Sequence, residues 1–457
     1  MGIKSSLPTA LKYHALVIEQ RARELGLDFF DVVFELLDAR DVNGIAAYGG
    51  FPVRYPSWRF GMEFERLQKG YKWGTSKIYE LVINNDPTYA YLVRSNSLLE
   101  QKLVMAHVFG HADFFKHNVW FGATERKMLD RMGHHSTRVR RMIDAHGQDR
   151  VEERLDDMLS IESLIDPFAS KSGAAPRPRA VPSLSEQRSR RLEEFGRDPR
   201  PAPETADLVP TFPVSDILGF LAREAPLEGW ERELLEIVRA EAYYFLPQRL
   251  TKIANEGWAC YWHSRILTGG ILEADEIVDF ADVHSGATAS SPGQLNPYRL
   301  GLRLYRYAEE MGQDLFMLRR IHNDVSLIDA LVDERFALEY HGARLEDSRA
   351  AKEQGFEWQE WKEGLLRSLS YGGQPRIDLV GVGSDTKREL VLAHRHDGRD
   401  LQLAQAGETM KRLSRIWRAP VHLRTKVEDE DCLVVATQDG FDVHRSESET
   451  EGAAKAG

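Results

Sequence analysis

The sequence contains little cysteine and no long apolar run. Two cysteines, Cys260 and Cys432, occur in 457 residues, which argues against a disulfide framework and fits a reducing compartment. No stretch of about 18 consecutive apolar residues is present, so the sequence predicts no membrane span. The first twenty residues lack the apolar segment of a secretory signal peptide, and we therefore expect a cytoplasmic protein.

Acidic residues outnumber basic ones. Lys and Arg number 60 against 71 Asp and Glu, which gives a net charge of -11. This balance argues against a nucleic-acid partner held by general attraction to phosphate. The basic stretch "RVRRM" at 138–142 is interpreted as a solvated face or a contact to acidic segments, with an anion site as the alternative. Hydrophobic residues at 42% and aromatic residues at 10% indicate a globular protein.

The first third of the chain predicts helices around one irregular segment. Apolar spacing predicts a helix over 8–40, whereas the Gly- and aromatic-rich segment 44–75 is expected to be irregular and packed by its rings. Further expected elements are a strand over 77–86 with a turn at Asp86-Pro87, a helix from near Ser97, and a helix over 136–163. Ser136 or Thr137 would cap that last helix, with His134 and His135 before it.

Composition changes twice in the rest of the chain. Residues 168–212 are rich in Pro, Arg and Ser and predict an exposed linker or excursion. Helical patterns fill 214–340 with an interruption at 284–301. From about 375, four apolar runs predict strands around a helix at 401–417. The fold class is therefore a mainly α-helical body over 1–345 with a C-terminal α+β domain over 346–445, followed by a disordered tail at 446–457.

The segment "HVFGHADFFKHN", residues 107–118, contains the first candidate site. His107 and His111 are four residues apart, so on a helix they share a face and their imidazoles can converge on one ion. Zinc proteases use this spacing in H-E-x-x-H, but Val108 stands where that motif has its glutamate. The alternative is that both histidines are ordinary helix residues. Gly110 indicates close approach of another element.

The segment 246–267 contains the expected partner helix. Glu256, Cys260 and His263 share one face, and a carboxylate in this apolar, Trp-rich segment needs a partner. A divalent metal ion held by His107, His111 and Glu256 would provide one, and zinc or iron suits two histidines with one carboxylate.

Other interpretations of this partner helix stay open. Glu256 could instead pair with Arg or Lys. His263 lies about 10.5 Å from Glu256 along the helix axis, so it is a fourth ligand, an orienting partner or a proton donor. Cys260 is more typical of a small core residue.

His263 and His284 are the candidate catalytic residues. His284 is expected to begin the Ser-, Gly- and Pro-rich loop of 284–301, and loops often contain functional residues. Ser285 follows it, but neither an acidic partner nor a nucleophile elbow is evident, so a serine hydrolase is not expected. The turn at 296–298 is predicted to cap the next helix.

Several blocks together resemble the stage V sporulation protein R (SpoVR) family. They are "FPVRYPSWRFGMEFERLQKGY", "YELVINNDPTYAYL", "HVFGHADFFKHNVWF", "LPQRLTKIANEGWACYWH", "LNPYRLG" and "MKRLSRIWRAPVHLRT". The resemblance extends from about residue 10 to about 440. It implies that His107, His111, the block 255–259 and His263 belong to a shared histidine-rich site, and that His135 and His284 fall where relatives have histidine.

The resemblance implies a role in spore cortex formation or in stress and envelope physiology. A metal-dependent hydrolase is the leading interpretation. Relatives are often encoded near a serine protein kinase of the PrkA type, so the alternative is a non-enzymatic regulatory partner of such a kinase. In that alternative, the histidines are structural.

Overall fold

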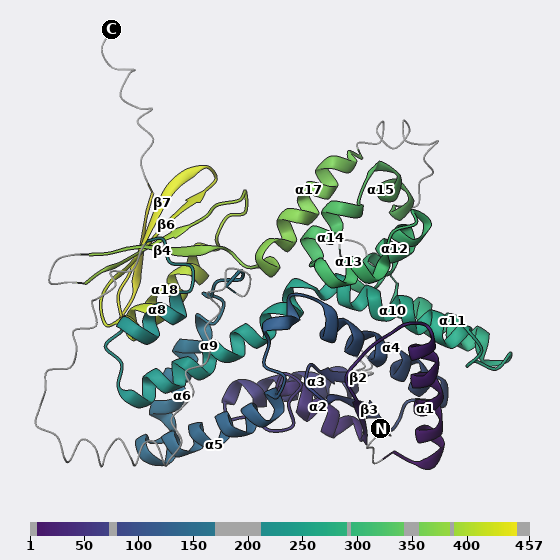
Figure 1. The fold of residues 1–457 in the computed structure, drawn as a ribbon. Helices are drawn as coiled ribbons and strands as arrows, with labels where there is room; N and C mark the ends of the chain where they lie inside the picture. Colours follow the sequence, from purple (N-terminus) through teal and green to yellow (C-terminus); the bar gives the residue numbers. More distant parts are fainter. Residues whose placement is uncertain are drawn as a thin grey trace, which may run out of the picture. The chain divides into compact units, whose positions relative to one another are not determined.

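The computed structural model describes residues 7–72, 80–169, 212–289, 294–341, 356–383 and 388–445 (Figure 1). Contacts within the chain divide it into two compact units, residues 1–154 with 243–374 and residues 155–242 with 375–457. The chain is mainly helical and has a five-stranded sheet with a helix near its C-terminus, so the predicted fold class is confirmed. Most of the predicted linker (170–211) and the predicted tail (446–457) lie outside the described residues.

Helices form most of the first unit. Those with all their residues in it are α1 (Thr9–Glu24), α2 (Ala39–Ala47), α3 (Trp58–Lys72), α4 (Leu98–His117), α5 (Met128–His146), α10 (Lys252–Thr268), α11 (Glu276–Ala287), α12 (Pro297–Glu310), α13 (Leu315–Ile321), α14 (Asp324–Leu331), α15 (Glu334–Tyr340) and α17 (Trp358–Leu369), with the 3-10 turns η1 (Phe121–Ala123) and η3 (Ser370–Gly373). α6 (Gln148–Ser160) and α9 (Gly229–Leu250) contribute residues to both units.

The first unit also contains a small sheet in which β3 (Thr88–Val93) is central. β1 (Val32–Leu37) pairs with it in parallel and β2 (Glu80–Ile83) in antiparallel orientation. The expected helix over 8–40 is therefore wrong beyond α1. Gly26, with a φ of +95°, follows the end of α1 in a conformation that glycine adopts readily. The β-branched start of β1 then favours pairing with β3 over continued helix.

The expectation of an irregular segment over 44–75 is also wrong, because α2 and α3 occupy much of it. Gly49 and Gly50 have positive φ values of 72° and 94° and separate the two helices. Ring packing does occur here, since Tyr48 and Tyr55 both contact the Phe60 ring. The rings belong to helices or pack against them. The Gly- and aromatic-rich composition therefore made the helical spacing of apolar residues hard to recognise.

α5 begins earlier than the sequence predicted. It starts at Met128 and ends before Gly147, which has a φ of +87° and separates it from α6. His134 and His135 therefore lie inside α5, and the proposed caps at Ser136 and Thr137 are wrong. The buried residues of α5 recur at Met128, Met132, His135 and Val139 among others, a helical spacing that extends the element toward its N-terminus.

The core of the first unit brings α10 against both α4 and α12. α4 begins as predicted, with Ser97 as its cap: the Glu100 backbone N–H donates to Ser97 Oγ at 3.2 Å, and the Ser97 N–H donates to the Glu100 carboxylate at 2.7 Å. A side chain on Gly257 would lie 2.3 Å from the backbone of Gly301 in α12. This contact holds the two helices at a separation that only glycine permits.

The second unit is built around a mixed sheet of order β4-β5-β6-β7-β8. The strands are β4 (Ile377–Val382), β5 (Leu390–His394), β6 (Val421–Val427), β7 (Glu430–Ala436) and β8 (Phe441–Arg445). β5 and β6 are parallel and the other neighbours antiparallel. α18 (Leu403–Trp417) packs on β6, β7 and β8, and Figure 1 shows it beside the sheet. The four predicted strands and the helix are confirmed, and β8 is an addition.

Residues between 155 and 242 also contact this sheet. Val214 and Leu379 pair through their backbones, Ser215 Oγ donates to Asp378 Oδ1 at 2.7 Å, and Phe220 of α8 (Ile217–Glu224) contacts Trp417. The sequence pattern had assigned this stretch to the helical body. That 1–345 and 346–445 fold as separate domains stays a prediction.

Across the described residues, each helix is either too short or too polar to cross a lipid bilayer.

Candidate metal centre

Two helices of the first unit bring the predicted site residues together. His107 and His111 lie on α4, and Glu256 and His263 lie on α10. Gly110 allows this approach, since a side chain there would lie 2.7 Å from the Cα of Ala259. The close contact expected at Gly110 is therefore present, and it comes from the helix that contains Glu256.

His107, His111 and Glu256 form one group of potential ligands. Glu256 Oε2 lies 3.4 Å from His107 Nε2 and 3.5 Å from His111 Nε2. The three ligand atoms lie within 4.8 Å of one another, and both imidazoles are buried. Among the described residues, the basic groups within 4 Å of the Glu256 carboxylate are these histidines, which are charged only when protonated, rather than the Arg or Lys that the alternative interpretation requires.

These distances match the geometry of a metal site. Nitrogen and oxygen ligands about 2.1 Å from one tetrahedral ion lie about 3.4 Å from each other. A charge-assisted hydrogen bond would instead be about 2.7–2.9 Å long. Asn255 Oδ1 lies 2.9 Å from His111 Nδ1 and accepts its proton, so in the neutral ring the Nε2 lone pair of His111 faces the carboxylate. A cation between the two would remove this repulsion.

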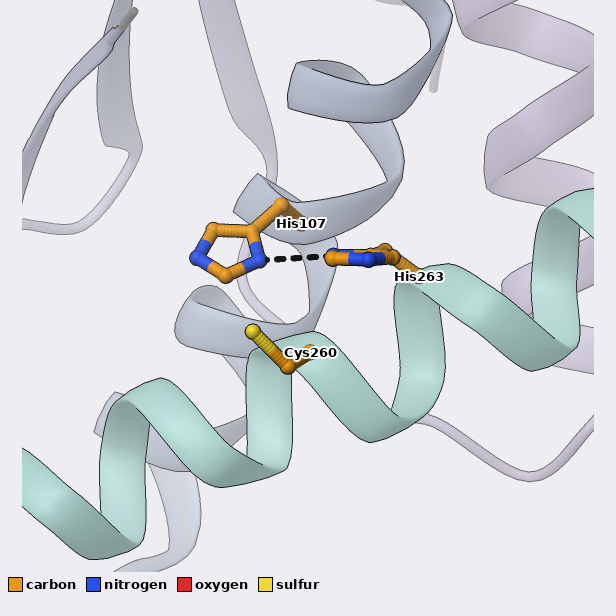
Figure 2. Close-up of side chains that lie close together, drawn as sticks. All are labelled: His107, Cys260 and His263. Carbon is orange, nitrogen blue, oxygen red and sulfur yellow. Dashed lines mark hydrogen bonds between the residues drawn. The ribbon is translucent and has the colours of Figure 1, made fainter. Parts of the chain in front are cut away.

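The opposite nitrogen of His107 faces a second group. Its Nδ1 lies 2.9 Å from Nδ1 of His263, and Figure 2 shows the Cys260 sulfur next to the same two rings. Ligand atoms of His107, Cys260 and His263 lie within 4.8 Å of one another, and all three residues are buried. The ring of His107 therefore stands between two groups of potential ligands.

His284 continues this series of histidines. Its Nδ1 lies 2.9 Å from Nε2 of His263. The expectation that His284 begins a loop is wrong, because it lies within α11, where it stacks on buried Phe280. The loop composition starts only after Ala287, and Asn296 caps α12 as predicted. The Ser and Gly residues next to His284 obscured the helical pattern of Ile277, Phe280 and His284 that precedes them.

Glu256 and the two outer histidines of the cluster have shifted pKa values. Burial alone would raise the pKa of Glu256, but the imidazoles of His111 and His107 outweigh it and hold that pKa well below its ordinary value. Burial, together with the rings of His107 and His284, lowers the pKa of His263 well below the usual 6.5. Burial and Arg306 lower the pKa of His284 as well. A carboxylate and neutral imidazoles are the forms that bind metal.

Two residues of this site are not evident from the sequence pattern. Asn255 fixes the ring of His111, and the block 255–259 contained it without suggesting that role. Cys260 is more typical of a core residue in the sequence, and its shared face with Glu256 and His263 is the feature that points to the cluster. Whether a side chain orients a ligand depends on how two helices pack against each other. Residue spacing within one helix does not show this packing.

The fold and site define a mainly helical protein with a buried histidine, cysteine and glutamate cluster that could hold a metal ion. Residues 6–374 match the family described as SpoVR like protein, and residues 375–428 match the SpoVR-like C-terminal domain. The chain belongs to the SpoVR family. The change from one match to the other falls at residue 375, where the second compact unit resumes.

A curated relative extends over nearly the whole chain. It is the protein of Escherichia coli strain K12 named "Uncharacterized protein YcgB", 27% identical over 473 residues, which cover 90% of this chain and 91% of the relative. No solved structure matches. The family is therefore established, while the comparisons name no reaction, metal or partner.

Proposed function

We propose that this protein is a metal-dependent hydrolase whose ion is held by His107, His111 and Glu256. One observation supports it most directly: Glu256 Oε2 lies 3.4 and 3.5 Å from the two Nε2 atoms, the separation of ligands around a tetrahedral ion. Zinc or iron suits this donor set. When bound, the ion would supply Lewis-acid activation of the scissile bond.

The ligand residues leave one side of the site open. The solvent-exposed fraction of the side chain is 16% for Glu256, 4% for His107 and 7% for His111. Substrate would therefore approach from the side of Glu256. Three protein ligands leave coordination positions for it, as in catalytic zinc sites.

In this proposal His263 and His284 position the site. His263 holds the ring of His107 through the Nδ1 contact of 2.9 Å, and His284 holds His263 through its Nε2. Such partners fix the tautomer and orientation of a ligand histidine. A direct catalytic role for either residue stays a prediction.

Family membership supports the physiological part of the proposal. We place the hydrolase in the cytoplasm, in spore cortex formation or in stress and envelope physiology. Since mature cortex lies outside the cytoplasm, the substrate would be a precursor or a regulator. The alternative is a non-enzymatic partner of a serine protein kinase of the PrkA type, in which the histidine cluster holds its helices together without an ion.

Hydrolysis of model phosphoester, carboxylic ester and amide compounds tests the proposal. The full chain, purified without chelator, should hydrolyse one class, lose that activity on chelation and regain it with zinc or iron. Glu256→Gln should be inactive, and Glu273→Gln in the turn before α11 serves as the control. A protein that lacks both bound metal and activity in all three classes would favour the kinase partner.

A further inference from the structure

The ring of His107 has ligand groups on both sides. Its Nε2 faces Glu256 and His111, and its Nδ1 faces His263 and Cys260. Glu256 and His263 lie about 10.5 Å apart along α10, which prevents them from sharing one ion without strain. The His107 ring lies between them and contacts both through opposite nitrogens.

We propose that a second metal ion binds His107 Nδ1, His263 Nδ1 and Cys260 Sγ, so that the His107 imidazolate bridges two ions. This inference rests on the proposed function, because it adds an ion beside the first one. The second ion replaces the proton shared by the two Nδ1 atoms and the proton of the Cys260 thiol. Both protons leave to solvent when the ion binds.

In the metal-free protein the two Nδ1 atoms share a hydrogen bond, and their separation lies at the short end of the range that one ion allows. Two nitrogens bound at about 2.0–2.1 Å lie about 2.9–3.4 Å apart as the angle at the ion opens from a right angle to a tetrahedral one. The observed Nδ1–Nδ1 distance is 2.9 Å. Figure 2 shows the Cys260 sulfur directed toward the same space. Cys260 forms no disulfide, and a thiolate sulfur is a ligand that zinc binds well.

The second ion leaves the net charge of the site unchanged. The first divalent ion and the Glu256 carboxylate leave one uncompensated positive charge in a buried site, which is costly. The second ion introduces two positive charges together with a thiolate and an imidazolate. It therefore adds no net charge to the interior.

The two positions differ in the metals that they prefer. A set of two imidazoles and a thiolate favours zinc, cobalt or copper over magnesium and manganese. His284 completes the arrangement: with the ion on Nδ1 of His263, the Nε2 of that ring has the proton and donates to Nδ1 of His284, 2.9 Å away, which orients the ligand. Cys260 thus acts as a ligand instead of as a small core side chain.

Cobalt(II) titration of the metal-free full chain tests the second ion, because cobalt bound to thiolate gives a charge-transfer absorption in the near ultraviolet. We expect two cobalt ions per chain and this absorption in the wild type. Cys260→Ala should bind one ion without the absorption, and Glu256→Gln should keep the absorption. Cys432→Ala, which changes the buried cysteine of β7, should bind two ions with the absorption unchanged.

One cobalt ion per chain without the absorption would overturn the second ion, as would an absorption that persists in Cys260→Ala. The wild-type measurement decides this even if a variant fails to fold. If one ion is bound without the absorption and hydrolysis continues, the second ion alone is wrong. If no ion is bound, the second ion and the proposed function both fail.

Discussion

Nδ1 of His107 lies 2.9 Å from Nδ1 of His263, while Nε2 of the same ring lies 3.4 Å from the carboxylate of Glu256. One imidazole therefore connects two residues of α10 that are about 10.5 Å apart along their helix. This relationship makes His107 the residue on which the whole cluster depends. It also gives the variants below distinct expected effects.

Glu256→Gln should weaken metal binding far more than it disturbs the fold. The amide keeps the size of the side chain but removes the negative charge next to two imidazoles. We expect the zinc dissociation constant to rise roughly tenfold or more, with the melting temperature of the metal-free protein little changed. Isothermal titration with zinc and thermal unfolding of the apoprotein check this. Equal zinc affinity in the two proteins would show that Glu256 is no ligand.

Gly257→Ala should separate α10 from α12. The added Cβ would lie 2.3 Å from the backbone of Gly301, and forced overpacking costs roughly 1–3 kcal/mol or more. Metal affinity should fall as well, because Glu256 moves with the helix. Gly133→Ala in α5 is the matched control: its Cβ would meet nothing within 4 Å, so stability should rise by about 0.5–1 kcal/mol. A Gly257→Ala variant as stable as this control would contradict the close contact.

Asp324 should make stability depend on pH. Burial raises the pKa of Asp324 from 3.8 to about 7. The carboxylate accepts hydrogen bonds from the backbone N–H groups of Ile253 and Ala254 at the start of α10, and these bonds lower the pKa in part. Between these two pKa values the folded state binds the proton more tightly than the unfolded state. Stability should therefore fall as pH rises from about 4 to about 7.

Asp324→Asn should reduce that fall, by up to about 3 kcal/mol between about pH 5 and about pH 8. Urea unfolding at about pH 5 and about pH 8 measures it. Asp329→Asn, at an exposed position of the same helix, should keep the wild-type pH dependence. A pH dependence that is identical in wild type and Asp324→Asn would show that Asp324 titrates as it does in the unfolded chain.

Spacing within a helix predicted much of this site, and packing between helices determined the rest. The shared face of His107 and His111 and the carboxylate on the partner helix follow from periodicity and from the cost of burying a charge. The orientation of the His107 ring does not follow from them, because it depends on how α4 crosses α10. Cys260 was undervalued for that reason.

The helix and strand assignments failed where local composition competed with tertiary pairing. Residues 32–37 fit a helical apolar spacing, yet they pair with β3, and a long-range partner is not visible in a local pattern. His284 was assigned to a loop because Ser and Gly follow it, although Phe280 one turn earlier is buried. The C-terminal strands were predictable because their alternating burial is a local property.

Metal content tests the central claim most directly. The full-length protein, purified without chelator, should contain zinc or iron at one or more ions per chain by inductively coupled plasma mass spectrometry. His107→Ala, which removes the shared ligand, should contain almost none, whereas His135→Ala in α5 should keep the wild-type content. Added zinc should raise the melting temperature of the wild type but not that of His107→Ala. A wild-type protein that is free of metal, and whose melting temperature does not change with zinc, iron or manganese, would contradict the metal centre.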